Sequence, residues 1–175
     1  MSFDKIPAGK DLPNDFNVII EIPAEHDPVK YEVDKETGAL WVDRFIGTGM
    51  RYPANYGYIP QTLAGDGDPV DALVITPFPL LAGAAVKCRA VGILKMTDEK
   101  GQDAKLVVVP VDKVCPMTAN IKALSDVPEH LKARIQHFFE QYKALEKGKW
   151  VKIEGWGGIE DAHVEIMDGV KNYKP

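Results

Sequence analysis

Short strand patterns occupy most of the first two-thirds of this 175-residue chain and leave little room there for helices. Each pattern is apolar or alternating and is bounded by glycine, proline or polar turn residues. In chain order they read FNVIIEIP, VKYEVD, ALWVDRF, DALVITPF, AVKCRAVGILKM and AKLVVVPV. The turn KETG joins the second to the third, so residues 29–45 predict a β-hairpin. Strands spaced this closely favour a small closed β-barrel.

The last third of the chain changes to a helical pattern. Apolar residues at spacings of three and four predict a helix near residues 129–147, namely Leu131, Ile135, Phe138, Tyr142 and Leu145. We expect Asp126 to cap its start and Gly148 to close its end. A strand, KWVKIEGW, and a second helix near residues 159–171 follow. The sequence therefore predicts a mainly β fold with two packed helices, in a single domain over residues 1–175.

Composition narrows the classes of function. The chain is 45% hydrophobic and 27% charged, as globular proteins are, and its formal net charge is −5. Because nucleic-acid-binding proteins are more often basic, this charge argues against that partner. Two distant cysteines predict reduced thiols rather than a disulfide framework. No segment reads as a secretory signal or approaches the ~20 apolar residues that span a membrane, so we expect a cytoplasmic protein.

Three aspartates fall within one short turn, in the segment AGDGDPVDALV. Asp66, Asp68 and Asp71 would repel one another if they shared a pocket without a counter-charge. A hard divalent cation such as Mg²⁺ or Mn²⁺ removes that repulsion, because carboxylate oxygens are its preferred ligands. The alternative reading is a solvated acidic turn. An EF-hand loop is excluded, because Val70 and Pro77 stand where it needs oxygen ligands.

A second acidic turn, in MTDEKGQDAK, favours the metal reading. It places Asp98 and Asp103 on a turn between two predicted strands, and Lys105 follows two residues later. Two acidic turns at strand ends could line one mouth of a barrel and supply ligands for more than one metal ion. Two-metal sites stabilise both the attacking and the leaving oxygen of a phosphoryl displacement.

Other residues have the chemistry to bind phosphate. Lys30 and Glu32 share a strand face, and Arg44 lies on the return strand of the hairpin with a planar fork that suits phosphate oxygens. The segment RYPANYGYIP predicts a rigid loop with phenol donors, including Tyr52 and Tyr56. Each of these residues also has an ordinary structural reading, as a surface ion pair or a packed tyrosine.

Together the blocks resemble a known family. KYEVDKETGALWVDRF, YPANYGYIPQT, GDGDPVDALV, VGILKMTDEKGQDAKLVVVP and FFEQYKALEKGKWVKIEGW are similar to segments of the soluble family I inorganic pyrophosphatases of the bacterial type. The resemblance implies an OB-like five-stranded barrel that hydrolyses pyrophosphate to two orthophosphates with several Mg²⁺ ions, for which Mn²⁺ or Zn²⁺ can substitute. It also implies a homohexamer, with the helix near residues 129–147 at an interface.

The same resemblance assigns roles to residues. It implies metal ligation by Asp66, Asp71, Asp98, Asp103 and Glu21. It implies that Asp68 is the general base for direct attack by a metal-activated water. The phosphate-binding set that it implies is Lys30, Arg44, Tyr56, Lys105, Tyr142 and Lys143, supported by Glu32 and Tyr52.

Two other functions stay open on the sequence. One is another Mg²⁺-dependent phosphohydrolase, such as a nucleotide pyrophosphatase. The other is a nucleic-acid-binding OB module, which would carry a basic groove with exposed aromatic side chains. The acidic turns at the expected mouth of the barrel argue against this second alternative, because they would repel a phosphate backbone.

Overall fold

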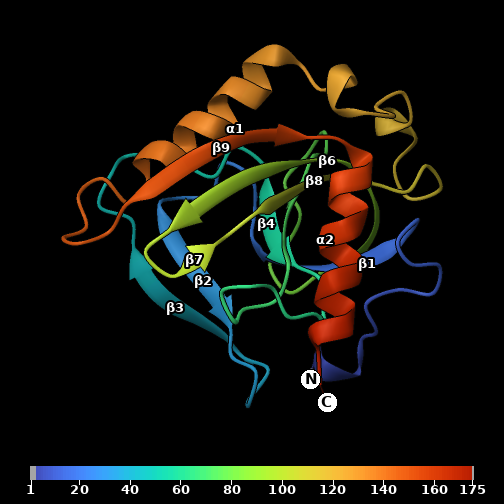
Figure 1. The fold of residues 1–175 in the computed structure, drawn as a ribbon, viewed down its shortest axis with the longest axis horizontal. Coiled ribbons are helices and arrows are strands. Elements are labelled where there is room, and N and C mark those ends of the chain that lie inside the picture. Colours follow the sequence, from blue (N-terminus) through green and yellow to red (C-terminus); the bar gives the residue numbers. More distant parts are fainter. Residues whose placement is uncertain (1–2, 175) are drawn as a thin grey trace.

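A closed ring of five strands forms the centre of the structure, a computed structural model that describes residues 3–174 (Figure 1). Around the ring the order is β1 (Phe16–Ile22), β4 (Asn55–Tyr58), β5 (Asp71–Val74), β8 (Lys105–Pro110) and β6 (Ala85–Asp98). Pairing of β6 with β1 closes the ring. All of these pairs are antiparallel except β5 with β8. The ring confirms the predicted OB-like, mainly β fold.

The long strand β6 connects the ring to the rest of the sheet. Besides β1 and β8, it pairs with β7 (Gly101–Gln102) and β9 (Val151–Gly157). Its register against β8 shifts between Ala90 and Gly92. An irregularity of this kind bends a strand and increases its twist, which lets one strand take part in both the ring and its extension.

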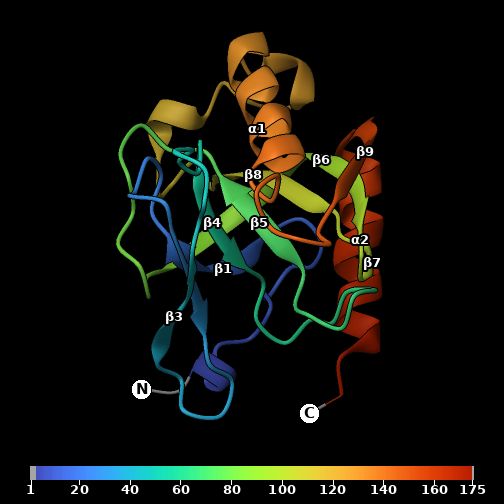
Figure 2. The same ribbon diagram turned by 90° about the vertical axis from the view of Figure 1, so that its left-hand side faces the viewer.

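The predicted hairpin is confirmed and forms a separate two-stranded sheet of β2 (Val29–Val33) and β3 (Leu40–Phe45). Its turn is held by Asp34, whose carboxylate accepts hydrogen bonds from the backbone N–H of Thr37 at 2.8 Å and from its hydroxyl at 2.5 Å. Figure 2 shows the hairpin on the opposite side of the molecule from the C-terminal helix.

The tyrosine-rich segment is a strand where we expected a loop. β4 runs through it and pairs with both β1 and β5. Gly57 makes this pairing possible, because a Cβ atom there would lie 1.9 Å from the carbonyl oxygen of Ile19. The density of proline and glycine conceals the strand in the sequence, although the close approach of two backbones is a common reason for a glycine in a strand.

Two α-helices pack on the ring (Figure 1), as predicted. The second, α2 (Ile159–Asn172), matches its expected range, whereas α1 (Glu129–Gln141) ends before residue 147. After Gln141 the chain makes successive three-residue turns, and Leu145 is 73% exposed instead of buried on the helical stripe. Gly148 therefore lies in a turn and does not close the helix.

The expected cap of α1 is also different. Pro128 is the N-cap residue. Asp126 ends a short 3-10 turn, η3 (Leu124–Asp126), and its carboxylate accepts hydrogen bonds from the backbone N–H groups of Lys122 and Ala123. The carboxylate thus satisfies donors upstream of itself. Two further 3-10 turns are η1 (Phe3–Lys5) and η2 (Pro116–Thr118). Across residues 3–174, no helix combines the length and apolar character needed to cross a membrane.

Two apolar clusters hold the helices to the ring. Under α1, the side chains of Ile135, Phe138 and Phe139 are buried together with Tyr52 and Tyr56. The ring of Phe138 packs against that of Tyr52 at a centroid distance of 4.4 Å, with the ring planes tilted by 47°. The other cluster joins α2 to the opposite side of the strands. The aromatic cluster therefore fixes the position of the chain that leaves α1, directly beside the tyrosines of β4.

The close approach at Gly57 makes a test of the ring. We expect Gly57→Ala to lower the free energy of unfolding by at least about 2–3 kcal/mol, because the added methyl group must displace the backbone of β1. Urea denaturation followed by circular dichroism measures the change. Gly49→Ala is the matched control, since nothing lies within 4 Å of a Cβ atom there. Equal stability of the two variants would contradict the tight β1–β4 packing.

Candidate active site

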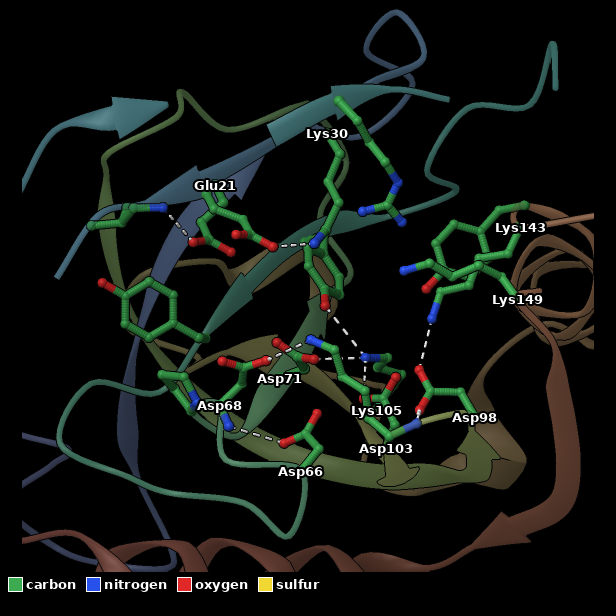
Figure 3. Close-up of a pocket in the computed structure, with 18 of the residues that line it drawn as sticks. Glu21, Lys30, Asp66, Asp68, Asp71, Asp98, Asp103, Lys105, Lys143 and Lys149 are labelled. Atoms are coloured by element: carbon green, nitrogen blue, oxygen red, sulfur yellow. Dashed lines mark hydrogen bonds and ion pairs between the residues drawn. The ribbon is translucent and has the colours of Figure 1, made fainter. Parts of the chain in front are cut away.

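One cavity opens between the ring, the hairpin and the segment after α1 (Figure 3). Six parts of the chain contribute to it: β1, the β2–β3 hairpin, β4, the loop that leads into β5, the β6–β8 connection with the start of β8, and the turn that follows α1. Of the site residues expected from the sequence, those that line it are Glu21, Lys30, Glu32, Arg44, Tyr56, Asp66, Asp68, Asp71, Asp98, Asp103, Lys105, Tyr142 and Lys143. Tyr52 lies behind this wall, with its ring 5.0 Å from that of Tyr56.

Lys105 occupies the floor of the cavity, with a side chain only 3% exposed. The parallel pairing of β5 with β8 sets Asp71 directly opposite it. Its Nζ lies 2.6 Å from Asp71 Oδ2 and 2.5 Å from Asp103 Oδ1, and donates a longer bond of 3.4 Å to the hydroxyl of Tyr56. Burial alone would lower the pKa of Lys105, but the two carboxylates hold it well above its usual value. The residue is therefore a fixed positive charge.

The aspartate loop turns tightly before β5. Gly67 adopts a left-handed conformation with φ of 89°. The backbone N–H of Asp68 donates to Asp66 Oδ1 at 3.1 Å, and the N–H of Ala64 donates to the carbonyl of Asp68 at 2.7 Å. These bonds fix the loop and leave the Asp68 side chain 54% exposed at the rim, whereas Asp71 is only 17% exposed. Asp68 is thus accessible to solvent and to a substrate.

Glu21 joins β1 to the hairpin. Its Oε1 accepts a hydrogen bond of 2.8 Å from the backbone N–H of Val33. Burial is the main cause that raises the pKa of Glu21, to about 8, and the nearby charges of Asp71 and Glu32 add to the effect. Without a cation at this position, the carboxyl group is mostly protonated at neutral pH.

Three cationic side chains that line the cavity, Lys30, Arg44 and Lys143, already have acidic partners. Lys30 pairs with Glu32, and Arg44 has its Nη1 2.6 Å from Asp43 Oδ2. Lys143 Nζ lies 2.7 Å from Asp98 Oδ2. Burial raises the pKa of Asp98, but the hydrogen bonds from Lys143 and from the backbone of Lys100, with the charges of Lys143 and Lys105, together outweigh it, so that the net pKa is lowered. These side chains would exchange carboxylate partners for phosphate when an anionic ligand enters.

Three carboxyl groups that line the cavity, those of Asp66, Asp71 and Glu21, fit divalent cations. Burial is the first cause that raises the pKa of Asp66, Asp71 and Glu21, and neighbouring carboxylates raise it further. A bound hard cation would favour the charged form of these carboxylates, against burial and the repulsion of their neighbours. In the part of the chain that the structure describes, no three acidic, histidine or cysteine side chains already converge as a metal site. Lys105 lies between two of the candidate ligands.

Sequence reasoning missed three lysines of the cavity wall. Lys35, Lys100 and Lys149 all line it. Lys149 Nζ lies 3.3 Å from Glu99 Oε1, which is also 3.7 Å from Lys143 Nζ. Lys35 and Lys100 lie in turns, three residues after Glu32 and two residues after Asp98, and this closeness in the sequence to predicted site residues is the one signal that could have indicated them.

The structure is thus an OB-like closed ring of five strands, with a cavity at its mouth that joins buried carboxylates to lysines and an arginine. The chain belongs to the inorganic pyrophosphatase family, whose model matches residues 18–174. It is 73% identical to an inorganic pyrophosphatase of Ralstonia nicotianae and 60% identical to one of Escherichia coli, each over 174 residues and 99% of both chains. The solved structure of an inorganic pyrophosphatase from Coxiella burnetii superposes with a TM-score of 0.93 at 51% identity, over 97% of this chain and all of the other.

The raised pKa of Glu21 predicts a dependence of stability on pH. In protein freed of metal by a chelator, folding keeps this carboxyl neutral while unfolding lets it ionise, so stability falls as pH rises from the ordinary value of 4.5 towards about 8. We expect Glu21→Gln to unfold like the unmodified chain near pH 4.5 and to be more stable by on the order of 3 kcal/mol near pH 8.

Thermal and urea unfolding at both pH values measure this difference. Glu36→Gln, an exposed glutamate in the hairpin turn, is the matched control. Destabilisation by Glu21→Gln near pH 8 would show that the charged form is the one the fold favours.

Proposed function

We propose that this chain hydrolyses inorganic pyrophosphate to two orthophosphates in the cavity described above. The observation that carries the proposal is that one cavity joins acidic side chains to cationic and phenolic ones. Asp66, Asp71 and Asp103, here called the acidic wall, line it together with Lys30, Arg44, Tyr142 and Lys143, here called the cationic wall. The names of the relatives and of the solved structures support this assignment.

The cationic wall would bind the substrate. Pyrophosphate presents oxygens at both ends, and Arg44 offers a planar fork while Lys30 and Lys143 offer mobile point charges. Donors fixed beside the leaving phosphate stabilise the charge that develops on it. Tyr142, which is buried against Phe138, adds a phenol held in one orientation. This wall therefore positions the leaving group.

The acidic wall would hold divalent cations through Asp66, Asp71, Asp98, Asp103 and Glu21. When bound, several Mg²⁺ ions would neutralise phosphate charge and make a water molecule more acidic. The raised pKa values of Glu21, Asp66 and Asp71 support this role, since burial disfavours the charged form of each carboxyl group and a bound cation would favour it.

Asp68 is the proposed general base. Its carboxylate is the exposed one of the aspartate loop, and the loop holds its backbone through the bonds of Asp66 and Ala64. A base at the rim can take a proton from water and return it to solvent, and the water then attacks phosphorus directly. No serine or cysteine lines the cavity among the described residues, so the side chains present offer no route through a covalent intermediate of that kind.

Two alternatives share parts of this chemistry. Another Mg²⁺-dependent phosphohydrolase, such as a nucleotide pyrophosphatase, would need a platform on which a base could stack. The aromatic rings of Tyr52 and Tyr56 are buried against Phe138 and Phe139, and do not provide one. A nucleic-acid-binding OB module would need a basic groove, whereas carboxylates line this cavity.

The finer properties implied by the family resemblance stay predictions. They are the preference for Mg²⁺ with Mn²⁺ or Zn²⁺ as substitutes, assembly as a homohexamer, and a cytoplasmic location. Exposed apolar side chains on β3 and after α1 are compatible with assembly, among them Trp41, Phe45, Leu145 and Trp150.

Release of orthophosphate from pyrophosphate, with and without Mg²⁺, tests the proposed function. We expect rapid release with Mg²⁺ and almost none after chelation, and little release from nucleoside triphosphates under the same conditions. Equal rates on a nucleoside triphosphate would favour the first alternative. Release of orthophosphate at the same rate with Mg²⁺ and after chelation would contradict the role of the acidic wall.

Replacement of the proposed base tests the mechanism. We expect Asp68→Asn to keep the fold and to lower kcat by about 10²–10⁴, because general base catalysis usually contributes that much. Asp161→Asn, an exposed aspartate on α2 outside the cavity, is the matched control and should leave kcat unchanged. Turnover by Asp68→Asn close to that of the control, with metal at saturation, would remove Asp68 from the role of base.

A further inference from the structure

Two lysines at the cavity rim have no part in the mechanism proposed above. Lys35 lies in the turn between β2 and β3, and Lys100 in the turn between β6 and β7. Lys35 Nζ lies 3.9 Å from Asp68 Oδ1, and Lys100 Nζ lies 3.7 Å from Asp68 Oδ2. Two distant parts of the chain thus place one positive charge near each oxygen of the exposed carboxylate.

These rim lysines differ from the inner ones in how firmly they are held. Lys105 and Lys143 are 3% and 9% exposed, and their ammonium groups lie 2.5–2.7 Å from carboxylate oxygens. Lys35 and Lys100 are 63% and 60% exposed, and their distances to Asp68 exceed those of a hydrogen bond. Because exposed pairs contribute little to stability, either ammonium group can move to another anion at small cost.

The backbone under each rim lysine is nevertheless fixed. The N–H of Lys100 donates to Asp98 Oδ1 at 2.8 Å. In the hairpin turn, the carbonyl of Asp34 accepts the N–H of Gly38 at 2.8 Å, in addition to the bonds from Thr37. Only the flexible four-carbon stems remain free. The turns therefore aim both ammonium groups over the rim while the side chains keep their reach.

We propose that Lys35 and Lys100 form a clamp that receives the outer phosphoryl group of a diphosphate as it enters, and so favours substrates in which that group carries no ester. This inference rests on the proposed function. Lys105 and Lys143 are already held by carboxylates. An incoming anion therefore first contacts Lys35 and Lys100, whose ammonium groups are held loosely. A diphosphate ester has less charge and more bulk at its outer end, and would gain less from two ammonium groups.

Substitutions that remove one charge each test the clamp. Lys35→Gln, Lys100→Gln and the double variant are compared with Lys171→Gln, an exposed lysine on α2 that lines no described cavity. Initial rates on pyrophosphate are measured with Mg²⁺ at saturation and at several KCl concentrations. We expect KM to rise roughly three- to fivefold for each single variant and about tenfold for the double variant, with kcat within about twofold.

The dependence on salt and on the retained charge separates recognition from structure. The dependence of kcat/KM on KCl should become weaker in the double variant, because rim charges act on association. Lys35→Arg and Lys100→Arg should keep KM near that of the unmodified chain. Thermal unfolding of each variant checks the fold. Values of KM and of salt dependence equal to those of Lys171→Gln would overturn the clamp, as would a fall in kcat with KM unchanged.

A binding measurement distinguishes failure of the clamp from failure of the proposed function. Calorimetry with methylenediphosphonate, which is not hydrolysed, should show weaker binding by the double variant than by Lys171→Gln, and a smaller difference for a monoester of the same diphosphonate. If the unmodified chain releases no orthophosphate but this pattern holds, the clamp stands and the proposed hydrolysis fails. If hydrolysis is normal and the pattern is absent, the clamp fails alone.

Discussion

The ion pairs of Lys105 with Asp71 and Asp103 are the constraint on which the cavity depends. An unpaired ammonium group in this position would cost several kcal/mol, and two adjacent carboxylates without it would repel each other. The parallel pairing of β5 with β8 sets Asp71 opposite Lys105 at the ends of two strands, and Asp103 follows from the connection just before β8. The register of the ring therefore also determines the ion pairs at its mouth. The aromatic cluster under α1 then closes the space above it.

The carboxylates of the cavity differ in how far nearby cations compensate their burial. Asp98 is satisfied by Lys143 and has a lowered pKa, whereas Glu21 and Asp66 have raised ones because burial is not fully compensated. The cavity thus lacks positive charge on its acidic side while its cations are already paired. Under the function proposed above, cations and a phosphate compound would each supply the partner that the other displaces, so that their binding would be coupled.

Much of the site could be predicted from the sequence, because its aspartates lie in two turns at strand ends and a closed ring brings strand ends together. The hairpin and both helices followed from periodicity in the same way. The pairing of β5 with β8 could not be predicted, because nothing in the local sequence distinguishes a parallel neighbour. The strand β4 could not be predicted either, because the prolines around Gly57 are typical of a loop. The end of α1 at Gln141 could not be predicted either, because tertiary contacts determine it. Tyr142 and Lys143 continue the helical pattern in sequence, but contacts with Phe138 and Asp98 direct them to the cavity.

The placement of charge also connects function with stability. A native state that buries carboxyl groups with raised pKa values is less stable at neutral pH than one with those groups satisfied. Ligands that bind only the folded chain stabilise it by a free energy that grows with the logarithm of their concentration. The apolar clusters on the two sides of the ring are built from buried side chains. The charged groups of the site lie at the mouth of the ring, and the site meets the cluster under α1 only through tyrosines such as Tyr56 and Tyr142, so its unfavourable charges do not disrupt the core.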